Sequence, residues 1–374
     1  MQKYHVSLIF TQPSYIIYQN VGVLVNELLL SRLLLSLNFR RVANIIKTSV
    51  SFFLSALLKK NIVWGVPPVL TIEPTNICNL RCPLCTTGSG EMERERGKMT
   101  LSTFKTIMDK LGDDIFFLLI YHQGEPYLNA NLFEFVKMAK TKNIYVTTST
   151  NGHYFTEENI EKTISCGLDS MIVSIDGITQ QTYENYRVGG KLETVIDGIK
   201  NLIAARKRQK SVTPNIAVQF LVMKHNEKEI PQMRNLAREL GVDRLLVKNI
   251  EVHSLEEAKM WLPCDKTCRR YDYDGENLVI KGSQKNSCAR PWLSTLINWD
   301  GAIVPCCFDK NGHYTMGTIT EANGITEIWQ GAAFNRFRKK LLENRKDIDI
   351  CRNCNQGLGS FLPQKHFKQI LNKK

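Results

Sequence analysis

Between residues 69 and 252 the chain alternates short apolar segments with amphipathic ones. Continuous β-branched or apolar runs of buried-strand type occupy residues 69–75, 116–122, 144–150, 170–176, 215–223 and 244–252. Helical periodicity separates them near residues 101–111, 129–142, 156–165, 192–209 and 227–240, and Thr100 and Thr156 stand in cap positions. Strands that alternate with helices form a parallel sheet with right-handed crossovers. Six units are too few for a closed eight-fold barrel, so the pattern predicts an α/β fold with a partial, TIM-like (β/α)6 barrel.

The regular alternation ends near residue 252. The tail is rich in cysteine and loops, and residues 293–306 predict a hairpin whose turn is Asp300-Gly301. A basic helix is expected over residues 332–345. We therefore divide the chain into an N-terminal basic amphipathic helical segment (1–62), a barrel core (63–252) and a small Cys-rich domain (253–374).

Composition places the chain among ordinary globular proteins, since 43% of its 374 residues are hydrophobic and 23% are charged. It contains eleven cysteines. The first twenty residues lack the pattern of a signal peptide, so a secreted disulfide framework is not expected. The sequence instead indicates a cytoplasmic, reducing environment, in which clustered cysteines are metal ligands or redox groups.

The net charge of +13 is concentrated at the N-terminus. Residues 1–60 contain seven basic side chains and one acidic side chain, a net charge of +6. Their apolar runs are shorter than the roughly 20 residues of a membrane-spanning helix. Two interpretations stay open: the segment packs its apolar stripe against the core, or it makes a peripheral membrane contact. No recognisable nucleic-acid-binding module accompanies the charge, so no nucleic-acid partner is expected.

Three cysteines follow the first predicted strand with the spacing C-x3-C-x2-C: Cys78, Cys82 and Cys85. Three thiolates suit a [4Fe–4S] cluster in which one iron has no protein ligand, and an open coordination position is typical of a catalytic metal site. Zinc is the alternative, but it normally recruits a fourth Cys or His at short spacing, and none follows within thirty residues.

The cysteine loop, with Leu84 before its third cysteine, resembles the radical S-adenosylmethionine (radical SAM) enzymes. The "GEP" of residues 124–126 is similar to that superfamily's "GGEP" segment, with Gln123 in place of its first glycine. The resemblance covers roughly residues 69–250. It implies a [4Fe–4S] cluster whose open iron binds SAM, and reductive cleavage of SAM to a 5′-deoxyadenosyl radical that abstracts a substrate hydrogen atom. The implied SAM-binding residues are Gly124, Glu125, Ser149, Asn151, Ser174 and Arg187.

The tail resembles the SPASM and twitch domains that carry auxiliary iron–sulfur clusters. Its matching residues are Cys288, Trp299, Asp300-Gly301, Pro305-Cys306, Gly317, Ile328-Trp329, Cys351 and Cys354. It has fewer cysteines than a full SPASM domain, so the resemblance implies one auxiliary [4Fe–4S] cluster on Cys288, Cys306, Cys351 and Cys354. Cys307 is interpreted as a neighbour of this cluster, because adjacent side chains on a strand point to opposite faces. Cys166, Cys264 and Cys268 are interpreted as unligated.

The resulting expectation is a radical SAM oxidoreductase or modifying enzyme. Its reaction would be an oxidation, dehydrogenation or other modification of a small-molecule or sugar-like substrate, with the auxiliary cluster as electron acceptor. An electron donor such as flavodoxin or ferredoxin would reduce the SAM-binding cluster. One alternative is maturation or cross-linking of a ribosomally made peptide. An alternative of another class is a zinc-stapled binding module on a membrane surface. The sequence assigns no general base.

Overall fold

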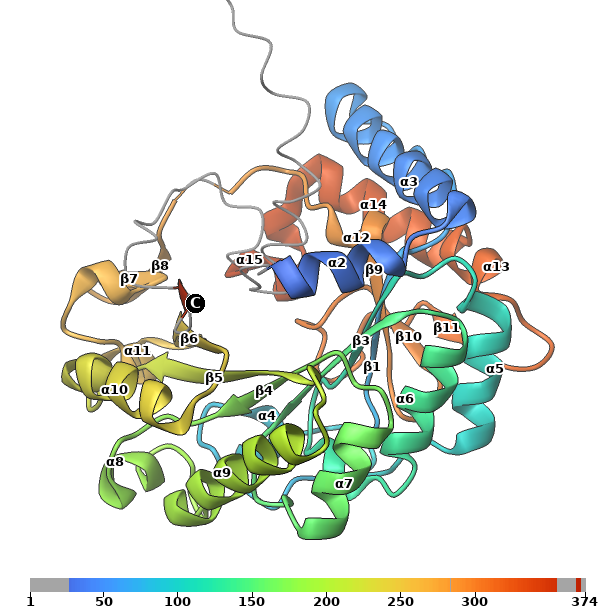
Figure 1. The fold of residues 1–374 in the computed structure, drawn as a ribbon. Coiled ribbons are helices and arrows are strands. Elements are labelled where there is room, and N and C mark those ends of the chain that lie inside the picture. Colours follow the sequence, from blue (N-terminus) through green and yellow to red (C-terminus); the bar gives the residue numbers. More distant parts are fainter. Residues whose placement is uncertain (1–26, 283, 355–367, 371–374) are drawn as a thin grey trace, which may run out of the picture.

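A curved sheet of ten strands organises the molecule (Figure 1). The structure is a computed structural model that describes residues 27–282, 284–354 and 368–370. Strand order across the sheet is β11-β10-β9-β1-β2-β3-β4-β5-β6-β12. The six predicted strands are β1 (Val69–Ile72), β2 (Phe117–Ile120), β3 (Tyr145–Thr150), β4 (Ser170–Ser174), β5 (Asn215–Val222) and β6 (Arg244–Asn249), and neighbours among them pair in parallel. The predicted partial barrel is therefore confirmed.

The outer face of the barrel is covered by helices that the sequence periodicity predicted. They are α5 (Leu101–Leu111), α6 (Leu132–Thr141), α7 (Glu157–Ser165), α9 (Leu192–Arg208) and α10 (Ile230–Leu240). Their apolar faces and the outward strand residues form one continuous core. Thr100 and Thr156 cap α5 and α7, each accepting a hydrogen bond from the backbone N–H three residues later.

The inner face of the barrel alternates polar and apolar layers. The layer nearest the amino ends of the strands contains Thr147, Ser170 and Asn215. Parallel register places Ser149, Ile172 and Ala217 in one layer. The next layer towards the carboxyl ends contains Ser174, Gln219 and Leu246. Ile172, Ala217 and Leu246 form a small apolar cluster, which lies between the polar groups of Ser174 and Gln219 and those of Ser170 and Asn215.

The Cys-rich tail continues the same sheet. Strand β9 (Ser294–Ile297) pairs in parallel with β1, and β10 (Ala302–Val304) returns antiparallel to β9. This is the predicted hairpin, and Gly301 in its turn has a φ of +87°. Strand β11 (Gly317–Thr318) lies at the edge, and the predicted basic helix is α14 (Ala332–Asn344). The loss of helical periodicity near residue 252 thus does not coincide with a break in the sheet.

Shorter elements complete the fold. The strands β7 (Tyr271–Asp274) and β8 (Asn277–Ile280) form a separate two-stranded sheet, and β12 (Lys368–Ile370) runs antiparallel along β6. The remaining helices are α2 (Glu27–Leu35), α3 (Phe39–Leu58), α4 (Thr86–Ser89), α8 (Gln180–Glu184), α11 (Leu255–Trp261), α12 (Arg290–Leu293), α13 (Ile325–Trp329) and α15 (Asp349–Arg352). Single 3-10 turns are η1 (Pro126–Leu128), η2 (Glu227–Glu229), η3 (Lys266–Cys268) and η4 (Arg345–Asp347).

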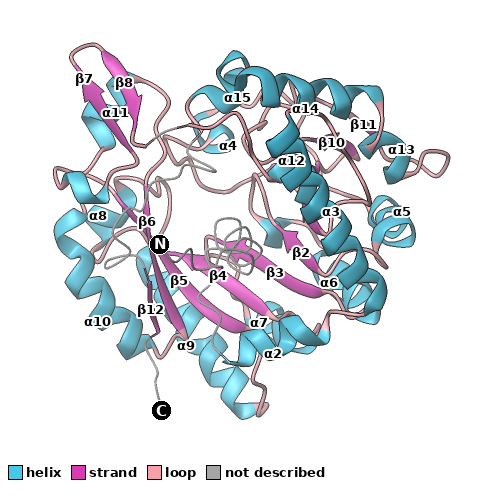
Figure 2. Cartoon of the chain, turned by 90° about the horizontal axis from the view of Figure 1, so that it is seen from above, coloured by secondary structure: helices cyan, strands magenta, loops and turns pink. Residues whose placement is uncertain are grey.

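The N-terminal helices pack at the end of the barrel at which the parallel strands begin, with α3 on the side of β2 and α6 (Figure 2). Leu33, Leu37 and Ile45 pack against a cluster of inner-face residues that includes Phe117 and Tyr145. The segment therefore packs on the core, as one interpretation expected. The prediction that the apolar stripe packs against the core is wrong for α3, because this helix buries a polar stripe and exposes most of its apolar stripe. Residues 1–26 of the predicted segment lie outside the described residues.

A buried ion pair joins the barrel to the tail. Glu73, directly after β1, is fully buried and accepts two hydrogen bonds from Arg94, at 2.8 and 2.6 Å. The Nε of Arg94 also donates to the carbonyl of Lys310, at 2.8 Å. The backbone N–H of Trp299 donates to the same Glu73 carboxylate, at 3.3 Å. One carboxylate thus connects the first strand, the segment after the cysteine loop and the hairpin of the tail.

Replacing Arg94 by alanine should strongly destabilise the protein, because it leaves the Glu73 carboxylate buried without a counter-charge. We expect a loss of about 3–5 kcal/mol in the free energy of unfolding, measured by chemical denaturation. The matched control is Arg208→Ala, which removes the exposed ion pair with Glu161 and should cost less than about 1 kcal/mol. Equal effects of the two substitutions would contradict a special role for the buried pair.

Candidate active site

The three cysteines of the loop lie at the carboxyl end of the barrel, between β1 and α4. Cys85 is the residue before α4, and its backbone N–H donates to the carbonyl of Cys82, at 3.1 Å. The three thiols are close enough to influence one another electrostatically. Burial raises the pKa of Cys78, and it raises the pKa of Cys82 to about 11. Iron binding must therefore displace a proton from these thiols.

Two glycines permit the close packing around this loop. A Cβ on Gly88 would lie 2.5 Å from the backbone nitrogen of Cys82 and 2.7 Å from its oxygen. Gly124 has a φ of +73°, and a Cβ there would lie 2.5 Å from the carbonyl oxygen of Thr75. The next residue, Glu125, donates its N–H to the carbonyl of Ile77, at 2.8 Å. The segment "GEP" is thereby held against the start of the cysteine loop.

Hydrogen-bond donors point at two of the three sulfurs. The backbone N–H of Leu80 lies 3.4 Å from the Sγ of Cys78, and the Nδ2 of Asn151 lies 3.9 Å from the same sulfur. The Nη1 of Arg187 lies 3.8 Å from the Sγ of Cys82. Donors and positive charge near a thiolate stabilise its ionised, metal-binding form.

Arg187 is fixed by a buried ion pair with Asp176. Its Nε and Nη2 both lie 2.6 Å from Oδ2 of Asp176, which is fully buried. Burial opposes the charge on Arg187, but Asp176 and Cys82 outweigh this effect, and the pKa of Arg187 lies well above its ordinary value. One edge of the guanidinium is thus committed to Asp176, and Nη1 remains directed at the cysteine loop.

Glu125 is the most perturbed acid of the site. Its carboxylate accepts hydrogen bonds from the hydroxyl of Thr150 at 2.7 Å and from the backbone N–H groups of Asn151 at 2.7 Å and Tyr127 at 3.2 Å. Burial nevertheless raises the pKa of Glu125 to about 7, against the lowering effect of these donors. The carboxyl group is therefore divided between its two protonation states near neutral pH.

Two further predicted residues reach the site from the strands. Ser149 lies in β3 and Ser174 ends β4, on the inner face. The residue that departs from the family motif, Gln123, has its own role. Its Oε1 accepts hydrogen bonds from the thiol of Cys85 at 3.7 Å and from the hydroxyl of Thr87 at 3.1 Å. A glycine at this position would offer neither contact.

The four cysteines predicted to hold the auxiliary cluster come together in the tail. Negative charge on Cys351 and Cys354 raises the pKa of Cys306, and negative charge on Cys288 and Cys354 raises the pKa of Cys351. Burial raises the pKa of Cys351 to about 12 and that of Cys306 well above its ordinary range. Four thiols gathered from three separate chain segments fit a fully ligated cluster.

Arg290 and Cys307 stand beside this group. The Nη1 of Arg290 lies 3.5 Å from the Sγ of Cys307. Cys288, Cys306, Cys307 and Cys354 all raise the pKa of Arg290 against the effect of its burial. The guanidinium therefore offsets negative charge that thiolates would place in this region. The interpretation of Cys307 as a neighbour rather than a ligand stays a prediction, but its reason is wrong, because Cys306 and Cys307 follow the end of β10 and do not lie on a strand.

All eleven cysteines are free thiols. The three interpreted as unligated differ in their surroundings: Cys166 and Cys268 are buried, whereas Cys264 is exposed. Within the described ranges, no group of three or more His, Cys, Asp or Glu side chains gathers closely enough to hold a single metal ion. In a cubane each thiolate binds a different iron, so its ligands stand farther apart than those of one ion.

A partial barrel with a three-thiol loop at the carboxyl end of its first strand, joined to a four-thiol tail, defines a class of iron–sulfur enzymes. Two family models identify it. The model of the radical SAM superfamily matches residues 72–237, and that of the iron–sulfur cluster-binding SPASM domain matches residues 288–355. The chain belongs to the radical SAM superfamily and carries a C-terminal SPASM-type domain. Its cofactors are SAM, a SAM-binding [4Fe–4S] cluster and an auxiliary iron–sulfur cluster.

Curated relatives are similar over most of their length. The tungsten-containing aldehyde ferredoxin oxidoreductase cofactor-modifying protein of Pyrococcus furiosus is 25% identical, over 72% of this chain and 82% of its own length. The PqqA peptide cyclase of Gluconobacter oxydans is 29% identical, over 73% of this chain and 79% of its own.

Solved structures share the fold. SuiB of Streptococcus suis bound to S-adenosylmethionine gives a TM-score of 0.57 at 15% identity, covering 76% of this chain and 70% of SuiB. BtrN in complex with AdoMet and 2-DOIA gives a TM-score of 0.50 at 22% identity, covering 82% of this chain and 99% of BtrN. At these identities the likeness concerns the fold alone.

Several residues that complete the site were not predicted. Asp176 orients Arg187, Thr150 binds Glu125, and Asn79 accepts a hydrogen bond from the Nδ2 of Asn151 at 2.8 Å. Each stands directly beside a predicted residue or at a strand end. Their position at the rim was a usable signal, because polar residues at the carboxyl ends of parallel strands collect at the catalytic end of a barrel.

Replacing Gly88 by alanine should disrupt assembly of the first cluster, because the new methyl group would displace the backbone of Cys82. After anaerobic reconstitution, we expect the variant to hold about four irons fewer per chain than the unmodified protein. Gly90→Ala is the matched control: its φ of +88° adds local strain, but no atom lies within 4 Å of the new methyl group. Unchanged iron content in Gly88→Ala would contradict this packing argument.

Proposed function

We propose that Cys78, Cys82 and Cys85 hold the SAM-binding cluster, and that Cys288, Cys306, Cys351 and Cys354 hold the auxiliary one. The observation that carries this proposal is the arrangement of donors around two of the three sulfurs of the loop, with no fourth thiol on the same loop. Leu80, Asn151 and Arg187 direct N–H groups at Cys78 and Cys82. When bound, the reduced cluster and SAM supply a 5′-deoxyadenosyl radical that takes a hydrogen atom from the substrate.

The chain's own polar groups would orient SAM. Gly124 and Glu125 offer a backbone and a carboxylate to the methionyl ammonium, and Ser149 and Asn151 lie on the strand end expected to meet the ribose. Ser174 and Arg187 are the proposed partners of the methionyl carboxylate. Since Asp176 already occupies one edge of Arg187, only the Nη1 edge is left for this role. Such pre-oriented charges lower the cost of ordering a charged cofactor.

The substrate is proposed to be a small, polar, sugar-like molecule that undergoes oxidation or dehydrogenation. Support comes from the inner face of the barrel, where Ser174 and Gln219 share a layer above Ile172 and Ala217. Hydroxyl and amide groups beside a small apolar cluster suit a polyol, which presents hydroxyls on its edge and C–H groups on its faces. The auxiliary cluster would accept the electron left on the substrate after hydrogen abstraction and proton loss.

Maturation of a ribosomally made peptide is the second candidate. It is favoured by the similarity to the PqqA peptide cyclase. A second relative, the mycofactocin maturase MftC of Mycobacterium tuberculosis, is 23% identical over 77% of this chain and 75% of its own length. Identifying the product formed with extracts of the native cell separates the two candidates. A peptide product would be a genetically encoded chain whose mass has changed, whereas the other candidate predicts a modified small molecule.

The setting of the reaction completes the proposal. A reducing cytoplasm suits eleven free thiols and oxygen-sensitive clusters. The electron donor is a small acidic carrier such as flavodoxin or ferredoxin, whose charge complements the net charge of +13. We propose the division into segments 1–62, 63–252 and 253–374 as a division of functions. It is not a division of the sheet, because the sheet runs from the core into the tail.

The two clusters can be separated by substitution. The unmodified chain should hold about eight irons and cleave SAM to 5′-deoxyadenosine after reduction. A Cys351→Ala/Cys354→Ala variant should hold about four irons and still cleave SAM. A Cys78→Ala/Cys82→Ala/Cys85→Ala variant should hold about four irons and not cleave it.

The control for this series is Cys166→Ala, which removes a buried thiol outside both groups and should keep about eight irons. Stoichiometric zinc with no iron in the unmodified chain would instead favour the zinc-stapled binding module.

Binding of SAM should strengthen as the pH rises through about 7, because the ammonium group pairs with ionised Glu125. The raised pKa of about 7 leaves the acid mostly protonated at pH 6 and mostly ionised at pH 8. We expect affinity to increase about tenfold over this range, measured by equilibrium binding to the reconstituted protein.

Two variants test this assignment. Glu125→Gln should weaken binding and flatten the pH profile, since the amide does not titrate. Thr150→Val removes a donor that lowers the pKa of Glu125, so the midpoint should move to higher pH. A profile in the unmodified chain as flat as that of Glu125→Gln is the contrary result.

A further inference from the structure

Helix α3 is amphipathic in the inverted sense. The residues it buries against the protein are polar: Arg41, Asn44, Thr48, Ser51 and Ser55. The residues on the opposite face recur at spacings of three and four, are apolar and are exposed: Phe39, Val42, Ile46, Val50, Phe53 and Leu57. Exposure is 91% at Phe39, 64% at Phe53 and 65% at Leu57. A surface helix of a soluble protein normally turns its apolar stripe inward.

The inverted orientation is specified by hydrogen bonds. The guanidinium of Arg41 donates to the carbonyls of Gly112 at 2.9 Å and Lys142 at 2.6 Å. Asn44 exchanges two hydrogen bonds with the backbone of Val66, at 2.9 and 3.0 Å. These bonds satisfy backbone groups just before the strands β1, β2 and β3. Turning the apolar stripe inward would leave those groups, and Arg41 itself, without their partners.

These contacts also distinguish a helix that spans a membrane from one that lies on it. By length and composition α3 is the single helix among the described residues that is able to cross a membrane. To cross, it would have to leave the core and carry Arg41 and Asn44 into hydrocarbon, at a cost of several kcal/mol. While the polar side stays bound to the core, only the outer apolar side is free to meet lipid. The geometry therefore fits a helix that lies flat in the interface.

Exposed apolar side chains continue beyond α3. Leu30, Leu34 and Leu35 of the preceding helix α2 are 47%, 56% and 78% exposed. Trp64, after α3, is 48% exposed, and tryptophan is enriched where proteins meet the lipid headgroups. The exposed set is larger than the scattered apolar side chains usual on a monomer, so it marks an interaction surface.

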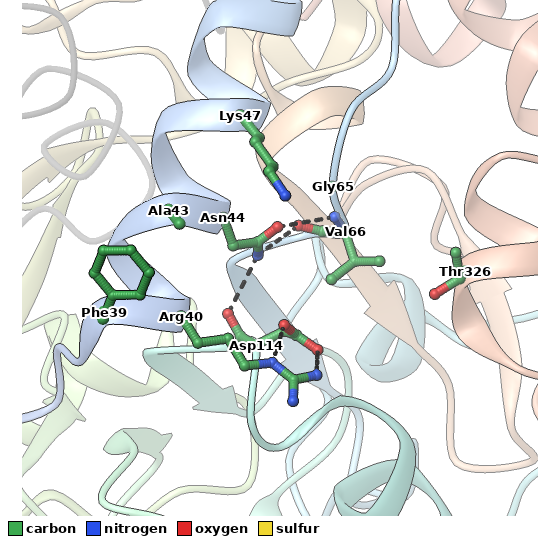
Figure 3. A pocket seen from close by; sticks show the side chains of 9 residues that line it. All are labelled: Phe39, Arg40, Ala43, Asn44, Lys47, Gly65, Val66, Asp114 and Thr326. Carbon is green, nitrogen blue, oxygen red and sulfur yellow. Dashed lines mark hydrogen bonds and ion pairs between the residues drawn. The ribbon is translucent and has the colours of Figure 1, made fainter.

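A basic cavity borders the apolar stripe (Figure 3). It has a volume of about 470 Å³ and is lined by residues that include Phe39, Arg40, Lys47 and Asp114. Arg40 is paired with Asp114, at 2.7 and 2.6 Å. Lys47 makes no ion pair with any residue in the described part of the chain. The cavity thus offers an uncompensated ammonium group beside apolar side chains.

We propose that the exposed face of α3 docks onto membranes that contain anionic lipids, with Lys47 binding a lipid phosphate in this cavity. Charge complementarity selects this occupant: Lys47, Lys59 and Lys60 are exposed and form no ion pair within the described residues, which favours an anionic surface over a neutral one. Apolar side chains in the middle of the face and basic groups on its flank are the arrangement of an interfacial helix. The proposal is independent of the chemistry proposed for the active site.

Docking in this orientation leaves the catalytic end of the barrel accessible. Arg41 and Asn44 bind the backbone that precedes β1, β2 and β3. The cysteine loop follows the carboxyl end of β1. The membrane-facing helix and the cluster loop therefore lie at opposite ends of the same strands.

Vesicle flotation of the full-length reconstituted protein tests the proposal. We expect binding to vesicles of phosphatidylcholine with one-third phosphatidylglycerol, and weaker binding to phosphatidylcholine alone. The double variant Ile46→Glu/Phe53→Glu should lower partitioning onto the anionic vesicles at least about tenfold, because it places two charges in the apolar stripe. Lys47→Ala should lower it about fivefold and weaken its salt dependence.

The matched control is Met260→Glu on α11, which places a charge on another exposed apolar side chain and should leave binding unchanged. Thermal unfolding and SAM cleavage, which should be unaltered in all variants, verify that each is folded. Three results would overturn the proposal. In the first, the unmodified chain binds neither kind of vesicle. In the second, the chain binds vesicles only after residues 1–26 are deleted. In the third, the unmodified chain self-associates without binding vesicles, and the double variant abolishes that self-association.

Discussion

The buried carboxylate of Glu73 is the constraint on which the rest of the structure depends. A charge with no exposed surface needs a counter-charge nearby, and Arg94 supplies it from the far side of the cysteine loop. Burial raises the pKa of Glu73, and the pairing with Arg94 opposes this change. Because the pair closes the chain around residues 74–93, it holds the loop against the barrel. Trp299 and Lys310 bond to the same two side chains, so the position of the tail depends on them too.

The surroundings of the thiols follow a similar rule. Cys82 lies in a buried environment in which a lone thiolate would be unfavourable, and burial accordingly raises its pKa to about 11. Arg187 offsets this cost only because Asp176 keeps the guanidinium charged and oriented. In the tail, Arg290 has the corresponding place among four cysteines. Each proposed cluster site thus has arginine beside its cysteines, Arg187 in the first and Arg290 and Arg345 in the second, and these charges would balance the negative charge of a ligated cluster.

The orientation of α3 illustrates how sequence-based prediction goes wrong for a physical reason. Its periodicity correctly predicts an amphipathic helix, and the common arrangement buries the apolar stripe. The strands that begin beneath it leave carbonyl groups that need donors, and Arg41 and Asn44 are the side chains that satisfy them. The apolar stripe is left outside. Which stripe faces inward was decided by hydrogen-bond satisfaction in the core, and that is invisible in the pattern of one helix.

The sequence by itself determined the order of strands and helices, the hairpin at Asp300-Gly301 and the two groups of cysteines, because these depend on local periodicity and short spacings. It also indicated the family, through the cysteine loop and "GEP". Only the tertiary structure decided that Asp176 fixes Arg187, that Thr150 supports Glu125, and that β9 joins the barrel sheet through β1. Partners such as Glu73 and Trp299 are separated by more than two hundred residues. Their pairing is set by how the chain packs in three dimensions, which no spacing along the sequence encodes.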